Sequence, residues 1–136
     1  VFTRDTHNQD YLNTREGKHL PIPHCIAQTE GWRVNGEILK AAEENKKARV
    51  AFVNKSTFSA GTSLYVGIQT ICEKPEAIEF CGTCTDICVV SNVLAMIGAF
   101  KEAQIIIHKD LCAGLTEEKH NAALEVMRSC QVEVVK

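Results

Sequence analysis

Short apolar runs recur along the chain, and polar or turn-forming residues bound each of them. Runs of this kind are typical of buried β-strands, which are shorter than helices and rich in β-branched residues. The runs that fit are Val1–Thr3, Val50–Val53, Ala77–Cys81, Ile105–Ile107 and Val132–Val135.

Segments with helical patterns lie between these runs. Gly36–Lys47 places apolar residues among Glu and Lys, and Cys88–Phe100 is apolar almost throughout, which suits a helix buried against a sheet. A last helix is predicted to open at Thr116, where a threonine followed by polar residues is similar to a capping box. The segment from 8 to 32 fits neither pattern, so we expect a long structured loop there.

Strands that alternate with helices predict an α/β fold, in which helices cover both faces of a mostly parallel sheet. We expect one domain over residues 1–136. Ligands of such sheets bind beyond the carboxyl ends of the strands. The residues that follow each apolar run are therefore the place to look for chemistry.

Composition and charge narrow the function classes. The formal net charge of −2 provides no basic field for nucleic acid. No apolar run approaches the roughly 20 residues that a membrane helix needs. The sequence shows no secretion signal and has an odd number of cysteines, 7, which argues against a disulfide framework and favours the cytoplasm.

Cys88 is the first candidate for chemistry, because it stands where a strand, a loop and a buried helix meet. A thiol at a helix N-terminus feels the positive end of the helix dipole, which favours the thiolate. The preceding loop offers backbone N–H groups for a developing oxyanion, and Lys55 at another strand end would add positive charge. The alternative is a buried cysteine that only packs.

Two other cysteine chemistries are weaker interpretations. Cys81 and Cys84 have the spacing of a redox motif, but Cys81 belongs to the predicted strand rather than to a helix N-terminus. A structural zinc site at Cys81, Cys84 and Cys88 lacks a second cysteine pair at matching spacing.

Asp5 and His7 are two residues apart, so their side chains point the same way on extended backbone. Together with Glu16 and His24, they could bind a divalent ion, with zinc, iron or manganese as candidates. The alternative is that these are solvated loop residues. His120 falls among charged residues of the last predicted helix and is interpreted as a surface residue.

The run GTCTDICV at 82–89 resembles the nucleophile motif of the cysteine hydrolases that include nicotinamidases and isochorismatase-like proteins. The order and approximate spacing of other segments agree, and the resemblance covers nearly the whole chain. These segments are Asp5–His7, Pro23–Cys25, Thr29–Trp32 and Asn54–Phe58. The resemblance implies the three-layer isochorismatase-like fold.

The resemblance also implies roles for individual residues. Cys88 corresponds to the nucleophile and Lys55 to the lysine of an Asp–Lys–Cys triad. A cis peptide bond is implied between Thr83 and Cys84, with the N–H groups of Cys84 and Cys88 as the oxyanion hole. The metal ligands of metal-binding members correspond to Asp5, His7 and His24, and Glu16 falls where some members supply a fourth, acidic ligand.

The sequence departs from the family pattern in two places. The triad aspartate belongs to a first strand upstream of Val1, and the chain begins without Met in what reads as a strand already under way. We therefore expect the first strand of the fold to be missing. Nicotinamidases hold the substrate ring with an aromatic residue where Pro21 stands here, so Tyr11 or Trp32 is expected to contact the substrate instead.

The resemblance implies an amidase that cleaves a small carboxamide through a thioester, with nicotinamide as the leading substrate and zinc as the leading metal. The alternatives are another amide, ureido or carbamoyl compound, or an inactive truncated family member. Ether hydrolysis of the isochorismatase type is disfavoured, because those relatives lack the cysteine. Members of this family are often dimers or tetramers, so the resemblance also implies a homo-oligomer.

Overall fold

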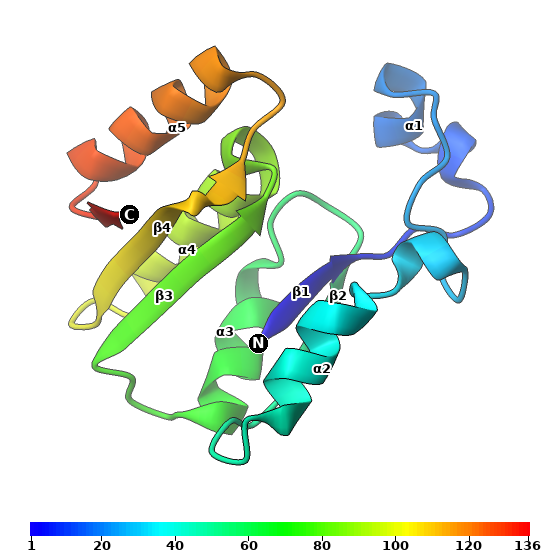
Figure 1. The fold of residues 1–136 in the computed structure, drawn as a ribbon. Coiled ribbons are helices and arrows are strands. Elements are labelled where there is room, and N and C mark those ends of the chain that lie inside the picture. Colours follow the sequence, from blue (N-terminus) through cyan, green and yellow to red (C-terminus); the bar gives the residue numbers. More distant parts are fainter. The chain divides into compact units, whose positions relative to one another are not determined.

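The computed structural model describes residues 1–136, which form two compact units, residues 1–60 and 61–136. All strand pairs in both units are parallel, which agrees with the predicted α/β class. Figure 1 shows the order of helices and strands along the chain. Every helix is too short or too polar to span a lipid bilayer.

The first unit is built on two parallel strands, β1 (Phe2–Asp5) and β2 (Phe52–Lys55). Their register pairs Phe2 with Phe52, whose rings stack at 5.6 Å between centroids, and Asp5 with Lys55. The sequence placed the second strand at Val50–Val53, two residues too early, so Lys55 is the last residue of β2 rather than a loop residue.

The connection from β1 to β2 contains several short helices, where the sequence predicted a loop over residues 8–32. Within this connection the chain folds back on itself, because Gly17 packs against the backbone of Tyr11. The helices are η1 (Tyr11–Asn13), α1 (Arg15–His19), η2 (Glu30–Trp32) and the predicted α2 (Gly36–Glu44).

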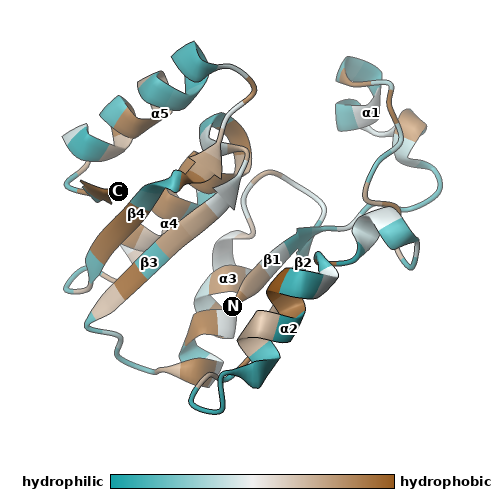
Figure 2. Cartoon of the chain, viewed as in Figure 1, coloured by the Kyte–Doolittle hydropathy of each residue, from teal (hydrophilic) through white to brown (hydrophobic).

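Helix α2 begins where Asn35 accepts hydrogen bonds from the backbone N–H groups of Glu37 and Ile38. An asparagine in this position satisfies donors that the first helical turn leaves unpaired. Figure 2 shows apolar residues beside polar ones along this helix. This is the amphipathic pattern that the sequence indicated for Gly36–Lys47.

The second unit is a three-stranded parallel sheet with helical crossovers. Its strands lie in the order β3 (Ala77–Thr83), β4 (Gln104–Ala113) and β5 (Glu133–Val135). Parallel neighbours need such crossovers, because the chain must return from the end of one strand to the beginning of the next, and a tight turn cannot span that distance. The helices are α3 (Gly61–Ile71), the π-helical turn η3 (Thr85–Val89), α4 (Val90–Ala99) and α5 (Glu117–Ser129).

One hydrophobic core joins α4 and α5 to the sheet. Apolar residues of β4 pack in one cluster with those of the two helices, and β5 follows α5 after a turn at 130–132. Burial of these side chains supplies the main driving force for folding of this unit. The fully buried members are Val93, Ile107 and Met127, and Val89, Ile105, Ala123, Leu124 and Val132 complete the cluster.

Two sequence predictions for this unit need correction, and one helix was missed. Strand β4 runs on to Ala113 instead of ending at Ile107, so His108, Lys109 and Asp110 lie within it. The helix predicted to begin at Cys88 begins at Thr85 as a π-turn. Helix α3 was not predicted. The capping interaction at Thr116 is present, since its side chain accepts a hydrogen bond from the Lys119 N–H.

We predict that Gly17→Ala destabilises the first unit. A Cβ at this position would lie 2.1 Å from the backbone oxygen of Tyr11, which cannot move without shifting the chain. Overpacking of this kind costs about 1–3 kcal/mol, which urea unfolding would measure. Gly31→Ala is the matched control, because nothing lies within 4 Å of its Cβ position. Equal stability of the two variants would contradict this account of the packing.

Candidate active site

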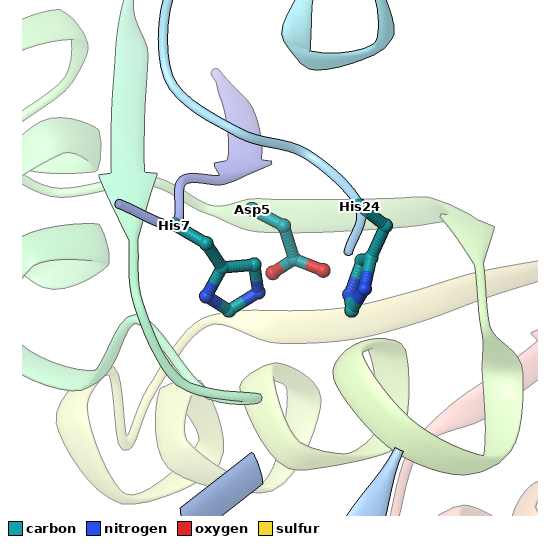
Figure 3. A group of neighbouring side chains, drawn as sticks. All are labelled: Asp5, His7 and His24. Atoms are coloured by element: carbon teal, nitrogen blue, oxygen red, sulfur yellow. The ribbon is translucent and has the colours of Figure 1, made fainter. Parts of the chain in front are cut away.

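Three of the predicted metal ligands come together in the first unit. Asp5, His7 and His24 each offer one ligand atom, and these atoms lie within 4.8 Å of one another. Figure 3 shows the Asp5 carboxylate and the two imidazole rings pointing toward a common centre. Two imidazoles and a carboxylate form a ligand set that suits zinc and other first-row divalent metals.

Backbone pairing beyond the end of β1 places the two histidines side by side. The His7 N–H donates to the Cys25 carbonyl at 3.0 Å, and the Ala27 N–H donates to the His7 carbonyl at 2.8 Å. This short parallel bridge fixes the segment after His24 against the segment after Asp5. The imidazoles of His7 and His24 meet edge to face, 4.9 Å apart.

Glu16 approaches both histidines from α1. Its Oε1 lies 3.7 Å from Nε2 of His7 and 3.8 Å from Nε2 of His24. Helix α1 is started by Thr14, whose hydroxyl accepts a hydrogen bond from the Gly17 N–H. Glu16 stands outside the group of three ligands, but its carboxylate faces the same ring nitrogens.

The hydrogen bonds of the two histidines decide which of their ring nitrogens can bind a metal. Nδ1 of His24 lies 2.9 Å from the Ile22 carbonyl, so Nδ1 carries the proton and Nε2 presents its lone pair. Nε2 of His7 is buried without a hydrogen-bond partner. An unpaired buried polar atom costs about 1–3 kcal/mol, which an ion in contact with it would remove. The residues therefore fit a divalent metal.

Tyr11 packs behind the histidines, and its contact with a substrate stays a prediction. It is only 1% exposed, and its hydroxyl donates to the Leu20 carbonyl at 3.0 Å. Its ring lies 4.7 Å from the ring of His7 and 5.0 Å from that of His24. Tyr11 orients the two imidazoles. Burial, with the nearby charges of Glu16 and Asp5, raises the pKa of Tyr11.

Trp32 is the second predicted substrate contact. Its side chain contacts Arg4 of β1 and Thr6, which follows that strand. Its indole N–H donates to the Thr6 hydroxyl at 2.8 Å, and the Arg4 guanidinium lies 4.0 Å from the ring centroid. Thr6 stands between Asp5 and His7. In this structure Trp32 braces the strand that carries two candidate ligands, and contact with a substrate stays a prediction.

Lys55 is buried at the end of β2 and forms an ion pair with Asp5. Its ammonium also donates to the Thr57 carbonyl at 3.2 Å. The register of β1 and β2 places these two residues directly opposite each other. The partner of Lys55 in this structure is therefore Asp5, which is also a candidate metal ligand.

The candidate nucleophile Cys88 lies in the second unit, in the turn η3 that follows β3. The Thr83–Cys84 peptide bond at the start of this turn is cis, as the resemblance implied. The Val89 N–H donates to the Cys84 carbonyl, five residues back, which gives the turn its π form. Turns of this kind are frequent at functional sites.

Polar side chains from two helices hold the turn. Asn92, buried at the start of α4, donates to the Cys88 carbonyl at 2.7 Å. His120 was interpreted as a surface residue, which is wrong: it is partly buried, and its Nδ1 lies 2.8 Å from the hydroxyl of Thr85. Sequence periodicity gives no signal for this contact, because it joins residues 35 positions apart.

The chain is similar to known proteins over its full length. The sequence model of the isochorismatase domain matches residues 1–136. A nicotinamidase from Bacillus subtilis matches with a TM-score of 0.80 and 28% identity, covering 100% of this chain and 74% of that chain. No curated protein has a sequence that matches significantly.

Two further solved structures share the fold at lower identity. The pyrazinamidase/nicotinamidase from Streptococcus mutans has a TM-score of 0.79 and 24% identity, over 98% of this chain and 74% of that chain. The pyrazinamidase of Pyrococcus horikoshii, solved in complex with zinc, has a TM-score of 0.72 and 23% identity, over 98% and 73%.

We predict that Tyr11 ionises above its ordinary pKa of 10.0 in the folded protein, because burial and nearby carboxylates disfavour the phenolate. Tyr65→Phe leaves Tyr11 as the only tyrosine, so ultraviolet absorbance can follow it. Its contribution to stability is present below pH 10.0 and is lost as the pH rises toward the raised pKa. Ionisation at the ordinary pKa in protein that is still folded would contradict this environment.

Proposed function

Because the chain belongs to the isochorismatase family, we propose that it is a cysteine-dependent amidohydrolase that acts on a small carboxamide, with nicotinamide as the first candidate. The observation that carries the proposal is the turn η3, which presents Cys88 after a parallel strand and a cis peptide bond. The similarity to the Bacillus subtilis nicotinamidase supports the choice of substrate.

In the proposed reaction the Cys88 thiolate attacks the carbonyl carbon of the amide. The backbone N–H groups of Cys84 and Cys88 donate to the oxyanion that forms. The carbon–nitrogen bond then breaks, ammonia leaves with the proton that came from the thiol, and a thioester remains on Cys88. Water hydrolyses the thioester to the carboxylic acid and restores the thiol.

Lys55 is the lysine of the triad in this proposal. Its ammonium is kept charged by the Asp5 carboxylate, since a buried cation without a partner would lose its proton. In the family pattern, the charge of this lysine favours thiolate over thiol and keeps the general-base carboxylate of the triad ionised. In the family pattern that carboxylate is an aspartate, and activity is best tested in full-length protein.

Asp5, His7 and His24 would hold a divalent metal, with Glu16 as a further oxygen ligand. Zinc is the first candidate because the ligand types suit it, and the Pyrococcus horikoshii pyrazinamidase was solved with zinc. Iron and manganese are the alternatives. When bound, such an ion supplies a Lewis-acid site for a ring nitrogen or a water molecule.

A second candidate is an amidase for another small amide, ureido or carbamoyl compound. The observation that favours it is the lack of an aromatic residue at Pro21, together with the burial of Tyr11. A nicotinamide ring would therefore be held differently from the family pattern. The resemblance further suggests a homo-oligomer, and the net charge, hydropathy and cysteine content of the sequence suggest a cytoplasmic protein with no nucleic-acid or membrane partner.

We predict that full-length protein releases ammonia from nicotinamide and that Cys88→Ala abolishes the release. Removing the nucleophile removes the covalent route, while Cys72→Ala, at an exposed cysteine of the same unit, should leave the rate unchanged. Nicotinate and ammonia should appear in equal amounts. Folded wild-type protein that releases no ammonia from nicotinamide would exclude this substrate and direct the search to other small amides.

We also predict that the metal-free protein binds about one zinc ion per chain, because structural and catalytic sites hold a single ion on such ligands. His7→Ala should weaken binding by more than the roughly 10–100-fold that loss of an outer partner costs. His19→Ala is the control, since His19 lies on α1 and bonds only the Arg15 carbonyl. Equal zinc affinity in both variants, measured by competition with a chelator, would rule out the proposed ligands.

A further inference from the structure

The turn that carries Cys88 is tied to helix α5 by a partly buried hydrogen bond. The hydroxyl of Thr85, the first residue of the turn, is fully buried and lies 2.8 Å from Nδ1 of His120. Thr85 stands three residues before Cys88. A shift of His120 would therefore either break this bond or move the start of the turn.

A second tie joins the same turn to the loop between β4 and α5. Oδ1 of Asp86 accepts a hydrogen bond from the Leu115 N–H at 2.9 Å. The loop comes this close because residue 114 is glycine: a Cβ there would lie 2.8 Å from Asp86 Oδ1 and 2.9 Å from the His120 Cβ. Gly114, Asp86 and His120 thus form one packed contact.

These ties add to the backbone hydrogen bonds that the N–H groups of Ile87 and Val89 donate to the Cys84 carbonyl. Its first residue follows Cys84, whose side chain makes no capping hydrogen bond. Neighbouring residues of α4 hold the far side of the turn, where Ser91 and Asn92 donate to the carbonyls of Ile87 and Cys88. The α5 side is held by Thr85 and Asp86.

We infer that His120 and Asp86 are positioning residues, which clasp the nucleophile turn to α5 and the β4–α5 loop and so fix the orientation of Cys88. The inference rests on the proposed role of Cys88 as nucleophile. It assigns His120 no proton transfer to the substrate. Its effect on the reaction passes through Thr85 and the backbone of the turn.

The test compares Thr85→Val, His120→Leu and the double variant with the wild type. Valine keeps the shape of threonine but removes the hydroxyl, and leucine removes the ring nitrogen. Displacing a reacting group by about 1 Å can cost on the order of 100-fold in rate, so we expect kcat to fall by about 10–100-fold with a smaller change in KM. The double variant should be no slower than the slower single variant, because all three lose the same bond.

A second readout does not require the substrate to be known. Each variant is treated with iodoacetamide, and peptide mass spectrometry follows the alkylation rate of every cysteine. We expect the rate at Cys88 alone to fall in Thr85→Val and His120→Leu, and to recover in His120→Asn, whose side-chain amide can occupy the place of Nδ1. His108→Leu is the control, because His108 lies on β4 and contacts Glu79 instead of the turn.

An unchanged alkylation rate at Cys88 in both variants, with the protein folded by circular dichroism, would overturn the inference. So would a similar rise at all cysteines, because that indicates general loosening of the unit. If Thr85→Val fails to fold, the comparison of His120→Leu with His120→Asn still decides the matter, since only the asparagine variant keeps a partner for the Thr85 hydroxyl. Absence of amide hydrolysis in the wild type would count against the proposed function only.

Discussion

The buried ion pair between Lys55 and Asp5 is the interaction on which the first unit depends. The side chain of Lys55 is 4% exposed and that of Asp5 is 26% exposed, so loss of Asp5 would leave a buried ammonium without its partner. The pair therefore holds the last residues of β1 and β2 in register. Fixing Asp5 in this way also fixes His7, two residues later. Backbone pairing of His7 with residues 25–27 then brings His24 next to His7.

Both candidate centres follow the same plan, in which a parallel strand ends at a reactive group and more distant residues hold that group in place. In the first unit, Tyr11 and the Ile22 carbonyl orient the histidines that could hold a metal. In the second unit, Thr85 and Asp86 tie the turn that carries Cys88 to α5 and the loop before it. Such support matters for chemistry, because reacting groups must keep their geometry while the bonds change.

Local patterns predicted the strands and the spacing of candidate ligands, but not the contacts that join distant segments. Asp5 and His7 were found because two-residue spacing on a strand is a local property. The support from His120 and Tyr11 depends on tertiary packing, which periodicity does not report. Helix α3 was missed because Gly61, Val66 and Thr70 are weak helix formers, and tertiary packing overrides that preference. The π-turn also has no local signature beyond the resemblance.

The central claim is that Cys88 carries the reaction through a covalent thioester. Full-length protein mixed with excess nicotinamide and quenched in acid during turnover tests this claim, because acid preserves thioesters for peptide mass spectrometry. The account predicts a nicotinoyl group on the peptide that contains Cys88, which disappears once the substrate is consumed. Turnover without an acyl group on any cysteine, or with the group on another cysteine, would contradict it.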